Sequence, residues 1–226
     1  MDLSKSLEWF SPSDVKGEVH IVGCGSVGSC LAELLARFGI TNFVLYDFDT
    51  VEAKNIANQM FFGSQVGKPK VEALRDILIA INPDCEDFVR MEPNGYTDQD
   101  MEGYVFLCVD NIEVRRNIVE ANRYNKNIKA MFDIRTGFLD AQHYAASWAD
   151  PKQVNNLLKT MNFSHEEAKA ATPVSACGVT LGLAPTVRGI VNVAVVNFVN
   201  FIKTGELKKT ASLSVFDLGE CHFLAL

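Results

Sequence analysis

The hydrophobic positions in the first part of the chain alternate between short strand-like runs and stretches with helical spacing. Residues 19–22 form a short apolar run, and residues 27–38 carry apolar side chains at helical spacing up to Gly39. Residues 42–46 are β-branched and aromatic, which is typical of a buried parallel strand. The chain is therefore predicted to open with a strand, a helix and a second strand, which together form a βαβ unit.

The same alternation continues up to residue 135. Pro69 stands where the first position of another helix is expected, and Asn82-Pro83 ends that helix. The pattern then predicts a buried strand, a helix and a further strand, at residues 104–109, 112–124 and 128–132. Strands that alternate with helices predict an α/β fold. We expect a Rossmann-like, doubly wound, mostly parallel sheet with helices on both faces.

The pattern changes after Arg135. Residues 147–172 are polar and contain two helix-start signals, which are Asp150-Pro151 and Ser164 followed by Glu167. This part of the chain is predicted to be a helical crossover segment over the surface. Such segments often cover an active site.

The C-terminal part contains one long apolar stretch and two strand-like runs. Residues 189–202 fall short of the ~20 residues that span a bilayer, so we expect a buried helix. Its polar interruptions mark a subunit seam or bond to buried neighbours; they are Asn192, Asn197 and Asn200. Residues 212–217 and 220–224 predict two strands joined by a short turn, as an antiparallel extension of the sheet edge.

Composition fits a single folded domain over residues 1–226. Hydrophobic residues make up 48% and charged residues 22% of the chain, as in ordinary globular proteins, and we find no repeat or linker. The formal net charge of −7 argues against binding nucleic acid or anionic membranes through bulk charge. No secretory signal is visible at the N-terminus, so a cytoplasmic protein is expected.

The cysteines do not form a metal-binding pattern. The chain has six of them and no C-x-x-C pair, so we expect reduced thiols and no zinc. The four histidines are scattered and also lack metal-ligand spacing.

A glycine-rich turn follows the first predicted strand. Its pattern is Gly23-x-Gly25-x-x-Gly28, and Ser26 lies where the helix opens. In this context backbone N–H groups and the positive end of the helix can bind a nucleotide phosphate. Asp47 ends the next strand, where a carboxylate can accept hydrogen bonds from ribose hydroxyls. A turn that merely packs a helix on a strand is the alternative, and the turn does not say which nucleotide binds.

Several linked motifs narrow the choice of nucleotide and of function. In order, they are DFDTVEAKNIANQ from Asp47, GKPKVEAL around Lys70, INP, CVDNIEVRR around Asp110, and CGVTLGLAP from Cys177. Their order and spacing resemble the ThiF/MoeB family of ubiquitin-activating-enzyme-like adenylyltransferases, from about Val19 to the C-terminus. The resemblance implies an enzyme that binds ATP and Mg²⁺, converts a C-terminal carboxylate to an acyl-adenylate and releases pyrophosphate. It implies as partner a small ubiquitin-like or sulfur-carrier protein with a Gly-Gly-type C-terminus, or a peptide, and a homodimer.

The resemblance also assigns roles to single residues. Lys70 matches the phosphate-contacting lysine, although a solvated lysine in a first helical turn is the alternative. Asp110 matches the magnesium-binding aspartate, and it could also cap a helix. Asp49 orients neighbouring groups or is simply solvated. Asn55 and Gln59 match the polar frame of an N-L-x-R-Q motif, where their amides hold phosphate oxygens or brace a short helix.

Two positions raise questions about catalysis. Asn58 stands where the motif has an arginine, so a bidentate cationic contact becomes at best a neutral one. Lys5, Lys16, Arg115 and Arg135 are candidate replacements for the lost charge. Cys177 matches the cysteine that ThiF joins to its carrier, but a buried, inert thiol is the alternative because no cation flanks it.

Two other functions remain open. A catalytically weakened nucleotide-binding scaffold would explain Asn58. An NAD-dependent oxidoreductase would explain the glycine turn and Asp47, but it gives no reason for Lys70 and Asp110 to occur with them.

Overall fold

The computed structural model describes residues 1–170, 173–176, 181–215 and 221–222. Its strands are β1 (Val19–Val22), β2 (Phe43–Tyr46), β3 (Arg90–Glu92), β4 (Gly103–Leu107), β5 (Ile128–Thr136), β6 (Asp140–Ser147), β7 (Thr210–Ser214) and β8 (Cys221–His222). Its α-helices are α1 (Ser26–Arg37), α2 (Lys70–Ile81), α3 (Ile112–Ala121), α4 (Pro151–Lys159), α5 (His165–Ala170) and α6 (Ala184–Thr204). Short 3₁₀ helices are η1 (Pro12–Asp14), η2 (Ala53–Ala57), η3 (Gly63–Gln65) and η4 (Pro83–Asp87).

The strands form one 8-stranded sheet in the order β3-β2-β1-β4-β5-β6-β7-β8. The first five strands in this order are parallel to one another, and the pairs β5–β6, β6–β7 and β7–β8 are antiparallel. The predicted fold class, including the antiparallel C-terminal extension, is therefore confirmed. The chain order reverses direction at β1, which pairs with β2 on one side and with β4 on the other. Ligands of open α/β sheets bind at such a switch point, beyond the carboxyl ends of the strands.

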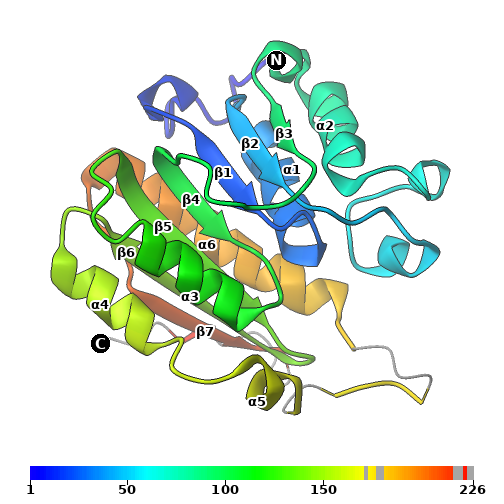
Figure 1. Cartoon of the computed structure of the whole chain (residues 1–226). Coiled ribbons are helices and arrows are strands. Elements are labelled where there is room, and N and C mark those ends of the chain that lie inside the picture. The colour runs from blue at the N-terminus through cyan, green and yellow to red at the C-terminus, as the bar shows by residue number, and fades with distance from the viewer. Residues whose placement is uncertain (171–172, 177–180, 216–220, 223–226) are drawn as a thin grey trace.

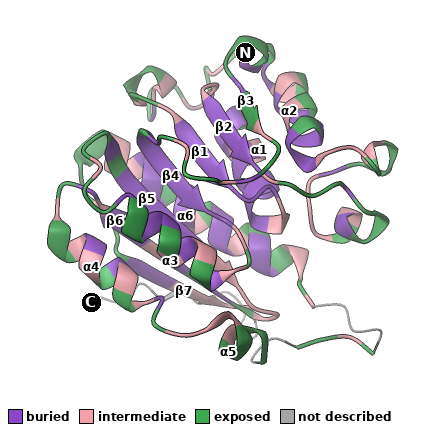
Figure 2. Cartoon of the chain, in the orientation of Figure 1, coloured by how far each residue is buried: buried purple, intermediate pink, exposed green. Residues whose placement is uncertain are grey.

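Helices cover both faces of the sheet. Figure 1 shows α3 and α4 in front of the strands, with α1 and α6 behind them. Residues of α1, α2 and α6 share one hydrophobic cluster, and residues of α3 and α4 share the other. Neighbours along β4 alternate between the two, since Phe106 belongs to the first cluster and Val105 to the second. The central strands are consequently buried on both faces (Figure 2).

Two strands have no counterpart in the sequence prediction. β3 is a three-residue edge strand with mostly exposed side chains, so it lacks the apolar pattern of a buried strand. β6 pairs antiparallel with β5, and its polar residues Gln142 and Asp140 are exposed. β5 itself runs four residues past the predicted end at residue 132, because its extension pairs with β6.

Helix ends agree with several local signals. α4 begins after Asp150, whose side chain accepts a hydrogen bond from the Lys152 N–H. α5 follows Ser164, which exchanges hydrogen bonds with Glu167 in a capping box. Pro69, in contrast, is the N-cap of α2 rather than its first helical residue.

α6 is longer than the apolar stretch predicted. Its 21 residues have the length and composition of a helix that could cross a membrane, and half of its apolar window is buried against the rest of the protein. Asn197 on this helix is buried and bonds to His143 and to the Lys208 backbone. That asparagine satisfies buried neighbours, which was one of the two alternatives for the polar residues of this stretch.

Candidate nucleotide-binding site

The glycines between β1 and α1 bring this turn close to the end of β4. Gly23 has a φ of +95°, and a Cβ atom there would lie 2.8 Å from the Val109 backbone nitrogen. A Cβ atom on Gly28 would lie 1.8 Å from the carbonyl oxygen of Gly23. These two glycines are therefore required by close packing of the backbone.

Gly25 has a different environment. It is the N-cap of α1, and nothing lies within 4 Å of the position that its Cβ atom would occupy. No side chain caps this helix, and no acidic residue lies in its first turn. The first N–H groups of a helix have no partner within the helix, and its N-terminus carries a partial positive charge. Open space in front of such a helix end suits an anion such as a phosphate group.

Asp47 lies directly beside this turn. One of its oxygens accepts a hydrogen bond from the Cys24 N–H at 2.7 Å, and the other accepts one from the Asp49 N–H at 2.9 Å. Burial raises the pKa of Asp47, while these two N–H groups and the charge of Lys70 oppose that rise. The carboxylate is thus oriented by the backbone at the end of β2, as a ribose-binding acid would need to be.

Lys70 is a buried cation at the start of α2. Its side chain is only 8% exposed, and its Nζ donates to Asp49 Oδ2 at 2.7 Å. Its backbone N–H also donates to the Asp49 carbonyl oxygen, at 2.9 Å. Lys68, two residues earlier, pairs instead with Asp76. Asp49 therefore orients a neighbouring group, which was one of the two alternatives for it. That group is the ammonium of Lys70.

The residues of η2 are only partly available to a ligand. Asn55 is buried, and its Oδ1 accepts the Glu52 N–H at 2.8 Å in a capping box, so it braces the short helix. Asn58 ends η2, and its Nδ2 would lie 3.2 Å from a Cβ atom on Gly182. Gln59 has a buried Oε1 without a hydrogen-bond partner. Gln59 lies just beyond η2, and this amide oxygen has no protein partner among the residues that the structure describes.

Asp110 lies just beyond β4, on the other side of the turn. It is exposed, and the N-cap of α3 is Asn111, whose Oδ1 accepts the N–H groups of Glu113 and Val114. The alternative that Asp110 is a helix cap is therefore wrong, because the next residue already fills that role. Its carboxylate borders an open pocket of about 680 Å³. The lining also includes Ser26, Arg135, Gly137, Phe163 and His165.

The two arginines beside this pocket are held by Asp133. Arg115 is buried, and it donates to Asp133 and to the carbonyl oxygens of Leu107 and Ile134. Arg135 also pairs with Asp133, and it bonds to Thr160. A single carboxylate therefore neutralises part of the charge of both guanidinium groups. Neither is a free replacement for the charge that Asn58 lacks.

Four cysteines have side chains that the structure describes, and all four are in the interior, where a thiol is disfavoured as a nucleophile. Cys24, Cys30, Cys85 and Cys108 are free and buried. Burial raises the pKa of Cys30 and Cys85 to about 11 and that of Cys108 to about 12. Cys177 lies outside the described residues. Within the described part of the chain, no three His, Cys, Asp or Glu residues gather as a metal site.

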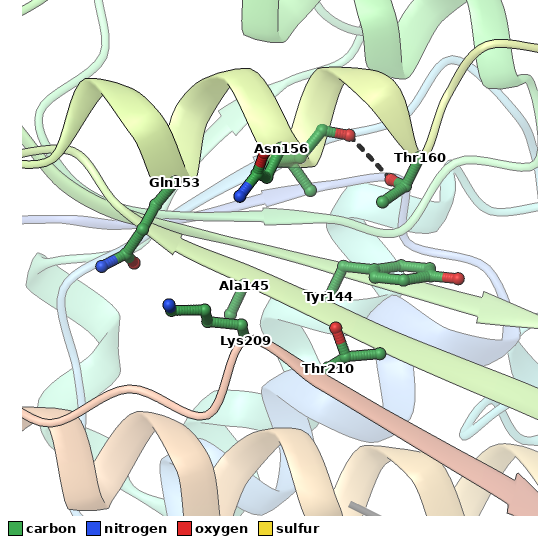
Figure 3. Close-up of a pocket in the computed structure, with 8 residues that line it drawn as sticks. Tyr144, Ala145, Gln153, Asn156, Thr160, Lys209 and Thr210 are labelled. Carbon is green, nitrogen blue, oxygen red and sulfur yellow. Dashed lines mark hydrogen bonds between the residues drawn. The ribbon is translucent and has the colours of Figure 1, made fainter. Parts of the chain in front are cut away.

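A second, much smaller pocket lies between α4, β6 and β7 (Figure 3). Its volume is about 30 Å³, and Tyr144, Thr160 and Lys209 are among the residues around it. A space of this size holds about one or two water molecules. The chemistry of the protein is therefore to be sought at the carboxyl ends of β1, β2 and β4.

The fold and the site define an α/β protein with an open helix N-terminus, two acids and a buried lysine at its switch point. The model of the ThiF family matches residues 15–218. The chain therefore belongs to the ThiF family, as its motifs predicted.

Curated relatives match somewhat less than half of the chain. The ubiquitin-like modifier-activating enzyme 5 of Caenorhabditis briggsae is 38% identical over 112 residues, which are 43% of this chain and 26% of that protein. The Arabidopsis thaliana enzyme of the same name is 37% identical over 123 residues, or 46% and 28% of the two chains. The matches thus span only about a quarter to a third of these relatives.

Solved structures share the fold over nearly the whole chain. E. coli MccB, in a structure with ATP, has a TM-score of 0.67 and 19% identity, and the match covers 94% of this chain and 65% of MccB. PaaA has a TM-score of 0.67 and 20% identity, with coverage of 95% and 67%.

Proposed function

We propose that this chain binds ATP with Mg²⁺ and adenylates the C-terminal carboxylate of a small ubiquitin-like or sulfur-carrier protein, or of a peptide. A carboxylate oxygen forms a bond to the α-phosphorus, the bond from that phosphorus to the bridging oxygen breaks, and pyrophosphate leaves. The observation that carries the proposal is the open α1 N-terminus at Gly25, flanked by Asp47 and by the buried Lys70.

The residues fit a nucleotide in a definite orientation. Asp47 is oriented to accept ribose hydroxyls, and the open space at Gly25 leaves room for phosphate oxygens against the N–H groups of α1. The reaction brings two anions together, so the site needs fixed positive charge rather than a general base. Lys70 supplies that charge, and Asp49 holds its ammonium group in place.

The exposed carboxylate of Asp110 fits a magnesium ion that arrives with the nucleotide. Mg²⁺ commonly takes one or two protein carboxylates and completes its shell with phosphate oxygens and water. Asp110 is free of the capping role and borders the same pocket as Ser26 of the glycine turn. When bound, the ion neutralises phosphate charge and polarises the phosphorus for attack.

The acceptor of the reaction is inferred from the relatives. The curated relatives are named as activating enzymes for ubiquitin-like modifiers, and MccB has been solved with ATP in one structure and with AMPCPP and MccA in another. The pocket of about 680 Å³ reaches from Ser26 and Asp110 towards Phe163, which gives an extended C-terminal tail a path to the phosphates. We also propose a homodimer, as the family resemblance implies.

Calorimetric titration tests the nucleotide. The protein should bind ATP with Mg²⁺ and not NAD, because a buried lysine and an exposed acid suit a triphosphate and its metal. Tight binding of NAD with no response to ATP would refute the proposal.

A scaffold that binds nucleotide without activating a partner is the second candidate, and neutral Asn58 favours it. Exchange of radiolabelled pyrophosphate into ATP, measured with a panel of Gly-Gly-ended carriers and peptides, separates the two. Exchange supports the enzyme. ATP binding without exchange for any tail supports the scaffold.

A further inference from the structure

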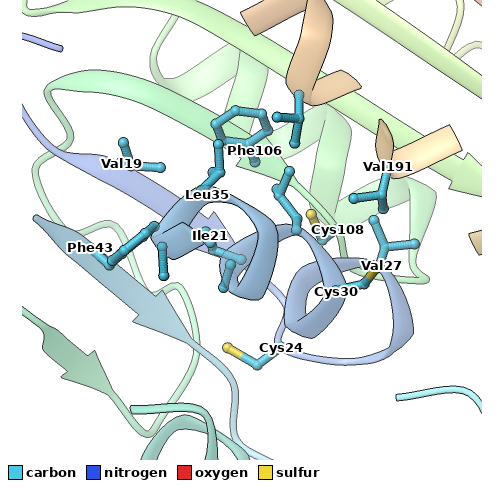
Figure 4. Packing of buried hydrophobic residues seen from close by; sticks show 14 of the residues in the cluster. Val19, Ile21, Cys24, Val27, Cys30, Leu35, Phe43, Phe106, Cys108 and Val191 are labelled. Atoms are coloured by element: carbon cyan, nitrogen blue, oxygen red, sulfur yellow. The ribbon is translucent and has the colours of Figure 1, made fainter. Parts of the chain in front are cut away.

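The start of α6 lies against the first turn of α1. Figure 4 shows Val191 of α6 beside Val27 and Cys30 of α1, and all three belong to one hydrophobic cluster. Thr186, in the first turn of α6, donates a hydrogen bond to the Phe138 carbonyl oxygen at 3.0 Å. Phe138 and Ser26 line the same pocket, so the N-terminal end of α6 is tied to the pocket that the glycine turn borders.

Arg188 extends from this part of α6 towards the end of η2. Its Nη2 lies 3.9 Å from the Met60 sulfur, and the Met60 N–H donates to Ser29 Oγ on α1 at 3.1 Å. Burial raises the pKa of Cys30, and the charge of Arg188 opposes that rise, which also places the guanidinium near α1. Asn58 approaches Gly182, which lies two residues before α6.

Arg188 differs from the other cations around this turn in having no carboxylate partner. Lys70 pairs with Asp49, Lys54 with Glu52, and Arg115 with Asp133. Arg188 is exposed, and no ion pair to it is found among the residues that the structure describes. Its contact in the described protein is the weakly polar Met60 sulfur. An ATP molecule carries about four negative charges. Lys70 and one Mg²⁺ together balance only part of that charge.

We propose that Arg188 binds the terminal phosphates of the nucleotide, from the α6 side of the α1 N-terminus. The inference rests on the proposed function, since it needs ATP at the glycine turn. A guanidinium presents a planar pair of donors that suits phosphate oxygens. In this position it supplies the charge that Asn58, on the neighbouring segment, does not carry. Gln59, whose amide oxygen is buried without a partner, lies between Asn58 and Met60 on this segment.

Titration of ATP and of AMP, each with Mg²⁺, tests this role. Arg188→Ala should weaken ATP binding by about tenfold or more, because a charge-assisted contact is lost, and should change AMP affinity by less than about twofold. The ATP affinity of Arg188→Lys should lie between those of the wild type and Arg188→Ala, since lysine keeps the charge and loses the paired donors. Lys203→Ala, which removes one charge from the opposite end of α6, should bind both nucleotides as the wild type does.

A double variant provides the decisive comparison. Asn58→Arg combined with Arg188→Ala should recover most of the lost ATP affinity, because it returns a guanidinium to the same place from the other segment. Unchanged ATP binding by Arg188→Ala, or an equal loss for ATP and AMP, would overturn the role of Arg188 and leave the proposed function standing. A wild-type protein that binds no ATP would overturn the proposed function, and this inference with it.

Discussion

Lys70 and Asp49 are 21 residues apart in the sequence, and the Lys70 Nζ lies 2.7 Å from an Asp49 carboxylate oxygen. The lysine is buried and the aspartate is half exposed, so the pair holds a cation at the edge of the glycine turn. Burying an ammonium group is costly unless it is paired, which explains why the two occur together. An incoming phosphate would meet a positive charge already in position.

Lys70→Ala should reduce pyrophosphate exchange by about 10²–10³-fold, the effect of losing one preorganised charge in a transition state. Lys68→Ala is the matched control, since Lys68 pairs with Asp76 at the surface and should leave exchange unchanged. If the two variants lost exchange equally, the assignment of the phosphate cation would be wrong.

The Gly25→Ala and Gly28→Ala variants should lose different properties, which are ATP binding in the first and thermal stability in the second. A methyl group at residue 28 meets the Gly23 carbonyl oxygen, so this variant should lower the melting temperature. A methyl group at residue 25 meets no protein atom, so that variant should melt like the wild type and bind ATP more weakly. Thermal melts and ATP titration check both. Undiminished ATP binding by Gly25→Ala would place the phosphates elsewhere.

Cys177→Ala should retain pyrophosphate exchange, because formation of the adenylate needs charge stabilisation and no thiol. Exchange assays on the variant, with circular dichroism as a folding control, measure this. Retained exchange together with loss of a carrier-linked adduct would assign the cysteine to transfer. Loss of exchange in a folded variant would show that the cysteine acts in adenylation itself.

Two buried histidines make the fold sensitive to acid. Burial lowers the pKa of His20 and of His143 to about 4, from an ordinary value of 6.5. The 3.3 Å contact between His20 and Glu18 is therefore not an ion pair at neutral pH. Below about pH 6.5 the unfolded chain takes up protons at these rings, whereas the folded protein does so only near pH 4.

The free energy of unfolding should consequently fall as the pH drops from 6.5 to 5, by about 2 kcal/mol for each histidine. Urea unfolding at several pH values measures this slope. His143→Gln should flatten it by about half and can still bond to Asn197. A free energy of unfolding that is constant over this range would show that the rings are not buried in the neutral form.

The sequence by itself determined the layers of the fold and the position of its switch point. Periodicity and turn residues act over a few positions, so the strands at residues 19–22 and 42–46, and the glycine turn between them, could be predicted locally. Asp47 and Asp110 follow predicted parallel strands. Their place at one edge of the sheet follows from that order, because parallel strands end at the same side.

Only the tertiary structure decided how the polar side chains are used. The side chain of Asn55 takes part in a capping box. Asn111, rather than Asp110, caps α3. Asp133 forms ion pairs with both Arg115 and Arg135. β3 and β6 exist because a neighbouring strand completes their hydrogen bonds, although their own residues lack a buried pattern. The approach of Arg188 to Met60 joins residues 128 positions apart. Contacts of this kind depend on how the helices pack, and no local pattern of residues encodes them.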